Sequence, residues 1–175
     1  AIGRYCDGHA RVCKSLRFVL SAGAPVPPGT LLSIRQMMSP EGQMHTPFGA
    51  TEALPIASIE SREVLDETAA LTEEGGGTCV GNHFDGVRWK VIAITDAPIE
   101  TLNQASELPN GQIGELIVCG DVVSRQYVTR PEQNALHKIA DGDQIWHRMG
   151  DVGYLDRRNR FFYCGRKAHR VELAN

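Results

Sequence analysis

The stretch of sequence that decides the fold is residues 146–167, WHRMGDVGYLDRRNRFFYCGRK. Two largely apolar arms flank the polar segment Asp156–Asn159, a pattern that predicts a β-hairpin over Tyr154–Tyr163. Asp151 lies in the first arm, and Arg166 follows the second. A carboxylate that only accepts hydrogen bonds and a guanidinium that only donates them together suit a ribose attached to a phosphate.

A second run, Phe48-Gly49-Ala50-Thr51-Glu52, places an aromatic ring, a flexible turn, a hydroxyl and a carboxylate side by side. In that order the residues could stack on a base, admit backbone, contact a phosphate and hold Mg²⁺. The run follows a predicted parallel strand, and ligands bind at that edge of open α/β sheets. The plainer alternatives are a core aromatic at Phe48, a turn-stabilising hydroxyl at Thr51 and a surface carboxylate at Glu52.

The first part of the chain predicts a parallel α/β sheet. Leu16–Leu20 is a short apolar run that ends in Gly/Pro punctuation, which indicates a buried strand. A helix is expected from the prolines at 27 and 28 through Met38, because proline is tolerated in a first helical turn. Met44–Phe48 is the next expected strand, and strand, helix, strand in this order is typical of a parallel sheet. A helix end is also expected over residues 4–14.

After Ser58 the pattern changes to that of a distorted antiparallel β-barrel lobe. Glu67–Gly77 is acidic, rich in hydroxyls and ends in three glycines, which predicts a surface loop. A helix is expected from Arg130 through Ile139, and a turn is expected at 141–143. The short strands of the lobe are predicted at Thr78–Gly81, Val87–Thr95 and Gly114–Cys119.

Three segments follow from these patterns and set the expected domain organisation. Residues 1–60 form the C-terminal part of an α/β nucleotide-binding subdomain, and residues 61–164 form a β-barrel-like subdomain. Residues 165–175 are expected to be a hinge to a C-terminal lid that the chain does not contain.

Composition excludes some classes of function. The 175 residues carry a net charge of −3 and no basic tract, so binding to nucleic acid through phosphate neutralisation is not expected. No apolar run approaches the roughly 20 residues of a membrane span, so no integral membrane segment is expected, and a cytoplasmic location is the default. The five cysteines are scattered without a C-x-x-C pair, which argues against a disulfide framework. Cys6, His9 and Cys13 share a spacing that fits either a metal half-site or one face of a helix, and the helix face is favoured.

Five motifs in order resemble those of the adenylate-forming superfamily, which includes acyl-CoA synthetases, luciferases and the adenylation domains of peptide synthetases. The matches are Ser21–Pro25 to GGAP, Phe48–Glu52 to YGxTE, Gly114–Gly120 to GELxxxG, Arg148–Asp151 to RTGD and Gly165–Lys167 to GRxK. Residues 55–59 and 169–172 depart from the acyl-CoA ligase pattern and look more like the β-lactone synthetases of long-chain olefin biosynthesis, which use a 3-hydroxy fatty acid.

The resemblance implies an ATP-dependent enzyme that uses Mg²⁺ and activates a carboxylic acid. Glu52 would hold Mg²⁺, and Thr51 would contact the α-phosphate. Asp151 and Arg166 would fix the ribose. Adenine would lie on Phe48, beside the Gly23–Ala24 turn, with Gly49 and Ala50 completing the nucleotide site. A homodimer or an assembly with olefin-pathway enzymes is an expected partner state.

The chain also departs from the family pattern. Phe48 stands in place of tyrosine and Met149 in place of threonine, and Ala168 stands where relatives carry a hinge residue, so Lys167 is the alternative hinge. The TSGSTGxPK-type phosphate loop and the lid lysine are absent, so we expect a middle piece of a longer enzyme that does not form acyl-adenylate by itself. An acyl-CoA ligase and a noncatalytic nucleotide-binding or scaffold fragment remain alternatives.

Each remaining candidate also has an ordinary structural explanation. Asp151 could cap the turn at Gly150, Arg166 could be a solvated arginine at the end of the hairpin, and the Gly23–Ala24 turn could simply join a strand to a helix. His147, beside the Gly-Asp pair, suggests a general base, but a structural histidine is favoured.

Overall fold

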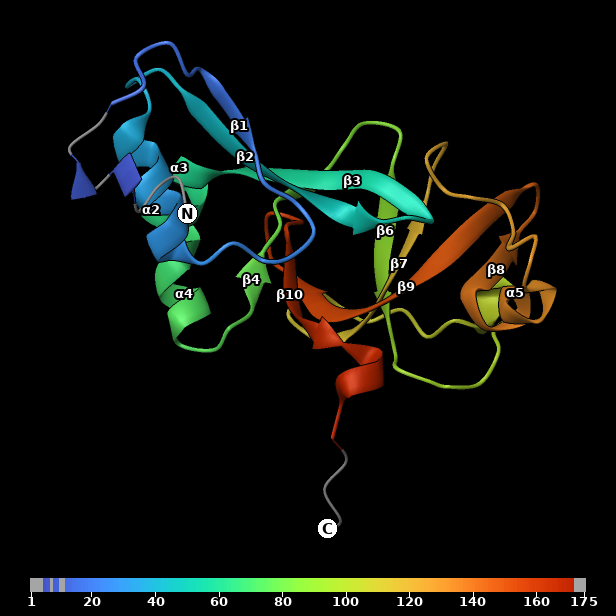
Figure 1. Cartoon of the computed structure of the whole chain (residues 1–175). Helices are drawn as coiled ribbons and strands as arrows, with labels where there is room; N and C mark the ends of the chain where they lie inside the picture. The colour runs from blue at the N-terminus through green and yellow to red at the C-terminus, as the bar shows by residue number, and fades with distance from the viewer. Residues whose placement is uncertain (1–4, 7, 10–11, 172–175) are drawn as a thin grey trace.

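The computed structural model describes residues 5–6, 8–9 and 12–171, which form two β-sheets flanked by short helices (Figure 1). The first sheet has the strand order β1-β2-β3-β5. Its strands are β1 Phe18–Leu20, β2 Gln43–Ala50, β3 Ala53–Glu60 and β5 Asn82–His83. The pair β1 and β2 is parallel, with Val19 opposite Met44, and the remaining pairs of this sheet are antiparallel.

The second sheet is antiparallel and curled, with the order β4-β10-β9-β7-β6 and with β8 also paired to β9. The strands are β4 Thr78–Cys79, β6 Arg88–Ile92, β7 Gly114–Cys119, β8 Lys138–Asp141, β9 Gln144–Leu155 and β10 Phe161–Arg166. The predicted fold class, the end of a parallel α/β sheet followed by a distorted antiparallel barrel lobe, is confirmed. The domain and hinge boundaries stay predictions.

Along the chain, helix α2, Pro28–Met37, connects the two parallel strands β1 and β2, as predicted. Pro28 occupies the first helical turn, where a missing backbone N–H costs nothing, and Leu31 and Met37 are buried. Of the helix end expected over residues 4–14, residues 5, 6 and 8 are helical, but residues 12–14 are not, because Cys13 forms a parallel β-bridge with Met38. Residues 4, 7, 10 and 11 lie outside the described residues. The remaining helical turns are α3 Ser61–Glu63, the π-helical η1 Val64–Thr68, α4 Ala69–Glu73, η2 Leu102–Gln104, η3 Pro131–Gln133, α5 Asn134–His137 and η4 Lys167–His169.

Several predictions about secondary structure were wrong. The first strand is not buried, because Phe18 is 54% and Leu20 is 60% exposed. The expected loop over Glu67–Gly77 is helical as far as Glu73, because Val64 and Thr68 are buried and hold the segment against the core. The expected helix through Ile139 ends at His137, because residues 138–141 pair with β9 instead.

The apolar core joins the two sheets. One cluster combines Ile56 of β3 with Trp89 of β6, Leu116 of β7 and Phe161 of β10. A second cluster packs α2 and β2 against Cys79 and Phe162, and a third fills the far side of the curled sheet around Trp146. Because both sheets contribute to one core, the loops between them are held in fixed positions.

The predicted hairpin is formed by β9 and β10, and charged groups fasten its turn. Asp156 Oδ1 accepts from the backbone amides of Arg158 at 2.9 Å and Arg160 at 2.8 Å. The Arg160 side chain donates to Asp156, and also to Glu63 at 3.0 Å and Glu67 at 2.8 Å. The turn is thereby joined to the helical segment that follows β3.

Candidate functional site

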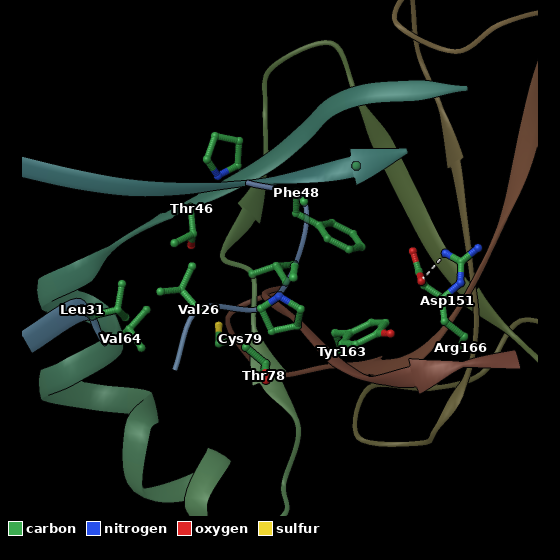
Figure 2. Close-up of a pocket in the computed structure, with 16 residues that line it drawn as sticks. Val26, Leu31, Thr46, Phe48, Val64, Thr78, Cys79, Asp151, Tyr163 and Arg166 are labelled. Carbon is green, nitrogen blue, oxygen red and sulfur yellow. Dashed lines mark hydrogen bonds and ion pairs between the residues drawn. The ribbon is translucent and has the colours of Figure 1, made fainter. Parts of the chain in front are cut away.

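A cavity of about 210 Å³ opens between the end of β2, the turn before α2 and the strands β4, β9 and β10. Figure 2 shows Asp151 and Arg166 together on one side of it, with Leu31, Val64 and Val26 at the other side. The cavity therefore has a charged end and an apolar end. Its lining includes Gly23, Ala24, Phe48, Gly49, Asp151 and Arg166, six of the residues predicted for the nucleotide site.

Asp151 and Arg166 form the charged end. They face each other across β9 and β10, and Arg166 Nη1 donates to Asp151 Oδ1 at 2.7 Å. The Asp151 side chain is 5% exposed, whereas that of Arg166 is 46% exposed. Burial raises the pKa of Asp151 and the bond from Arg166 opposes that rise, leaving the pKa above its ordinary value. The pair presents a carboxylate inside the cavity and a guanidinium at its mouth.

Phe48 lies between that pair and the apolar end. Its ring centroid is 6.0 Å from that of Phe161 and 6.4 Å from that of Tyr163. The ring thus packs on the core with one side and lines the cavity, which confirms a core aromatic and leaves stacking on a base a prediction. Gly49, next to it, has no room for a side chain, because a Cβ would lie 2.5 Å from the carbonyl oxygen of Ala53.

The Gly23–Ala24 turn lines the same cavity. Gly23 has a φ of +96°, which L residues with side chains rarely adopt, but a Cβ built there would have no heavy atom within 4 Å. The backbone conformation, rather than lack of space, therefore requires glycine at this position.

Thr51 and Glu52 lie away from this cavity. Thr51 is exposed and lines neither cavity, and Glu52 lines a second cavity together with Ala50, Tyr127 and His137. Arg166 lines both cavities. The structure therefore places the predicted site residues in two neighbouring spaces, with the exception of Thr51.

Tyr127 is a residue that the sequence did not single out. Its hydroxyl donates to Glu52 Oε1 at 2.9 Å, although the two residues are 75 positions apart. Burial raises the pKa of Glu52, but a backbone hydrogen bond and the Tyr127 hydroxyl outweigh it, so the net pKa is lowered. Burial and the bond to Glu52 raise the pKa of Tyr127 to about 12. The pair therefore holds an ionised carboxylate in the second cavity.

His147 is buried and lines the second cavity together with Glu52 and Tyr127. Burial, reinforced by the charge of Lys138, lowers the pKa of His147 to about 4, so the ring is neutral near pH 7. Its Nδ1 lies 3.1 Å from the carbonyl oxygen of His137, and it must carry the proton because a carbonyl only accepts. This accounts for a structural role, and the general-base hypothesis stays a prediction.

The candidate metal half-site finds no support among the described residues. Cys6 is buried in the second core cluster, Cys13 is exposed, and His9 stacks on Tyr5 with a centroid separation of 4.2 Å. Within residues 5–6, 8–9 and 12–171 no group of three or more His, Cys, Asp or Glu residues could hold a metal ion. The favoured interpretation, one helix face, is wrong for Cys13, which forms a parallel β-bridge with Met38, and only the buried, helical Cys6 fits it.

A buried charge cluster at the second cavity, which two of its members line, was also missed. It consists of Glu115 in β7, Arg148 in β9 and Lys167 directly after β10. All three belong to motifs quoted above, and the signal was an acidic residue inside the otherwise apolar strand GELIVC. Lys167 is one of the two predicted hinge residues, and the other, Ala168, lines the second cavity.

Comparison with known proteins agrees with this geometry. Residues 4–128 match the family described as AMP-binding enzyme, and the chain belongs to that family. It is 45% identical over 179 residues to an olefin beta-lactone synthetase of Stenotrophomonas maltophilia (strain K279a), covering 99% of this chain and 32% of that protein. An olefin beta-lactone synthetase of Xanthomonas campestris pv. campestris is 41% identical over the same share of both chains. The chain thus spans about a third of the length of these relatives.

The fold is shared with solved enzymes. The structure of O-succinylbenzoate coenzyme A synthetase from Bacillus subtilis superimposes with a TM-score of 0.71 at 19% identity, covering 99% of this chain and 33% of that one. In the part of the chain that the structure describes, no helix is long and apolar enough to cross a membrane.

Proposed function

We propose that this chain is the nucleotide-binding part of an ATP-dependent enzyme that activates a carboxylic acid as acyl-AMP and releases pyrophosphate. The observation that carries the proposal is the Asp151–Arg166 pair at the charged end of the first cavity, beside the ring of Phe48. A carboxylate can accept from both hydroxyls of a ribose, and a half-exposed guanidinium has donors left for phosphate oxygens. The family match supports ATP as the nucleotide.

In the first step an oxygen of the substrate carboxylate attacks the α-phosphorus of ATP. The bond from the α-phosphorus to the bridging oxygen breaks, and pyrophosphate leaves with that electron pair. Asp151 and Arg166 would fix the ribose, and Phe48 and the Gly23–Ala24 turn would hold adenine, so the residues act by positioning. Thr51 would donate to the α-phosphate.

The donor set around Glu52 fits Mg²⁺. This ion usually takes one or two protein carboxylates and completes its shell with phosphate oxygens and water. Glu52 offers one ionised carboxylate in a cavity, with Tyr127 bonded to only one of its oxygens among the interactions described. When bound, Mg²⁺ would neutralise developing phosphate charge.

Two olefin beta-lactone synthetases at 45% and 41% identity support the choice of substrate class. We assign a long-chain 3-hydroxy acid. Its hydroxyl oxygen attacks the carbonyl carbon of the acyl-AMP, the bond from that carbon to the phosphate oxygen breaks, AMP leaves, and the hydroxyl proton is released. The reaction is intramolecular, so proximity favours it without a thiol acceptor. A cytoplasmic location and a homodimer, or an assembly with olefin-pathway enzymes, complete the proposal.

The test compares two long-chain acids that differ only in the 3-hydroxyl, each with and without coenzyme A, using the protein at the full length of its gene. The 3-hydroxy acid should give β-lactone, AMP and pyrophosphate without coenzyme A. The acid without the hydroxyl should stop at the adenylate, which hydroxylamine traps as a hydroxamate. A thioester only when coenzyme A is added, with no lactone, would favour an acyl-CoA ligase. Nucleotide binding without pyrophosphate release from either acid would favour a noncatalytic scaffold.

A further inference from the structure

The buried charge cluster is placed where it can control the geometry of the nucleotide site. Glu115 is fully buried, and its Oε2 accepts from Arg148 Nη2 at 2.6 Å and Nε at 3.2 Å. Lys167 Nζ lies 3.2 Å from both carboxylate oxygens of Glu115. One buried acid thus draws together a residue of β9 and the residue that follows β10.

Backbone carbonyls complete the cluster. Arg148 Nη1 donates to the carbonyl of Ala97 at 2.9 Å and to that of Leu136 at 3.2 Å, and Nη2 donates to that of Thr95. The Thr95 carbonyl also accepts from Lys167 at 3.3 Å. Replacing a buried ion pair by apolar residues is often neutral or stabilising, so stability alone does not account for this arrangement.

The cluster lies next to the ribose-facing pair along the strands, and Arg148 and Lys167 line the second cavity, as does Arg166. Arg148 precedes Asp151 by three residues on β9, and Lys167 immediately follows Arg166. Glu115 itself pairs with Val152, the residue after Asp151. Each member of the cluster therefore lies on a strand position close to Asp151 or Arg166, or directly after such a strand.

The strands are irregular at this point, so their backbone hydrogen bonds alone do not specify the orientation of the Asp151 and Arg166 side chains. The register between β7 and β9 shifts between Glu115 and Ile117, and the register between β9 and β10 shifts between Tyr163 and Gly165. A bulge re-aims side chains, and a slip by one residue turns a side chain to the opposite face of a sheet. Contacts outside the ladder must hold Asp151 and Arg166 in their orientation.

We infer that Glu115 is a positioning residue for ribose recognition: through Arg148 and Lys167 it fixes the two irregular strands that aim Asp151 and Arg166 at the ribose hydroxyls. The inference rests on the proposed nucleotide role of that pair. Glu115 itself is buried and does not touch the nucleotide.

The test measures selectivity for the ribose rather than affinity alone. The dissociation constants of AMP and 2′-deoxy-AMP are measured by calorimetry with the protein at the full length of its gene, because the two ligands differ by one hydroxyl. In the wild-type protein the 2′-deoxy form should bind about tenfold or more weakly, as expected for losing a hydrogen bond to a charged group. In Glu115→Gln, which keeps size and shape, the ratio should fall below about threefold while the thermal melt still shows a folded protein.

The matched control is Asp156→Asn, an isosteric change of another ion-paired acid at the opposite end of the same hairpin. It should leave the ratio at the wild-type value. If Glu115→Gln weakens both ligands equally and keeps the full ratio, Glu115 has only a structural role and the inference is wrong. A wild-type ratio near one would instead overturn the ribose role of Asp151 and, with it, this inference.

A second variant covers the case in which Glu115→Gln does not fold. Lys167→Met removes the partner at the edge of the cluster, where the side chain is 15% exposed, and leaves the Arg148–Glu115 bonds in place. It should lower the ratio to a value between those of the wild type and Asp151→Asn. An unchanged ratio in Lys167→Met would overturn the inference independently.

Discussion

The two ends of the β9–β10 hairpin use the same chemistry for different purposes. At the turn, Arg160 is 9% exposed and donates to three acids, Asp156, Glu63 and Glu67. At the cavity, Arg166 is 46% exposed and donates to Asp151, the single acid with which it forms an ion pair among the described residues. A buried arginine held by three acids fastens a turn, whereas a half-exposed arginine with one acid partner has donors available for a ligand.

The largest effect is expected from breaking the buried charge cluster next to the cavity end of the hairpin. Arg148→Met leaves the buried carboxylate of Glu115 with Lys167 as its remaining cation, and removing one partner of a buried pair typically costs about 3–5 kcal/mol. Urea unfolding should show a loss of this size. The control Arg157→Met changes an exposed arginine of the turn and should stay within about 0.5 kcal/mol of the wild type. Equal losses in both variants would contradict the expectation.

The next effect separates binding from stability at the cavity end. Asp151→Ala removes an acceptor for the ribose, and losing hydrogen bonds to a charged group costs about 1.5–3 kcal/mol, or roughly 10- to 150-fold in ATP affinity. Calorimetric titration of the full-length protein with ATP measures it. Unchanged affinity would mean that Asp151 only caps the turn at Gly150.

A smaller effect is expected at the turn. Asp156→Asn keeps the shape of a side chain that accepts from two backbone amides and from Arg160, but weakens those bonds by removing the charge. The free energy of unfolding should fall by about 1 kcal/mol, with ATP affinity unchanged. A loss of nucleotide affinity in this variant would show that the two ends are not independent.

The smallest effect is on how the free energy of unfolding depends on pH. Asp156 at the turn and Asp151 at the cavity should contribute to this dependence with opposite signs. Burial raises the pKa of Asp156, but hydrogen bonds from Arg160 outweigh it, so the pKa lies below the ordinary 3.8 and its stabilising contribution is lost as pH falls through that value and below. The pKa of Asp151 is raised mainly by burial, so the folded protein takes up this proton first and its contribution to stability rises as pH falls towards 3.8.

Unfolding experiments between about pH 5 and pH 3 test these signs. The loss of stability on acidification should be shallower than wild type in Asp156→Asn and steeper in Asp151→Asn. The same slope in both variants would contradict the assignment.

The sequence predicted the parts of the fold that depend on local pattern. The hairpin, the strand Gly114–Cys119 and the parallel pair around α2 were all found, because apolar runs bounded by turn residues specify them. It did not predict β3, which follows the Thr51-Glu52 turn and pairs back on β2. The helical stretch Ser61–Glu73 was missed as well, because burial of Val64 and Thr68 is a tertiary effect that composition does not reveal.

The candidate site likewise contains residues that the sequence predicted and residues that it did not. The motifs identified Asp151, Arg166 and Phe48, and the structure brings these residues together in one cavity. The hydroxyl of Tyr127 on Glu52 joins positions 75 residues apart, and the bond from Arg148 to Glu115 joins positions 33 apart. Such partners depend on how distant parts of the chain fold together, and no spacing in the sequence indicates them.

The prior pairing of Asp151 with Arg166 has a consequence for how salt acts on the site. Because the carboxylate is already neutralised at 2.7 Å, a ribose that enters brings no charge and meets little net charge. The affinity for adenosine should therefore hardly change as sodium chloride is added. ATP carries its charge on the triphosphate, beyond this pair, and its affinity should fall as ions screen that charge over a Debye length of about 10 Å at 0.1 M. Measuring affinity against ionic strength would thus separate two contributions to nucleotide binding: that of the nucleoside, which does not depend on salt, and that of the phosphates, which does.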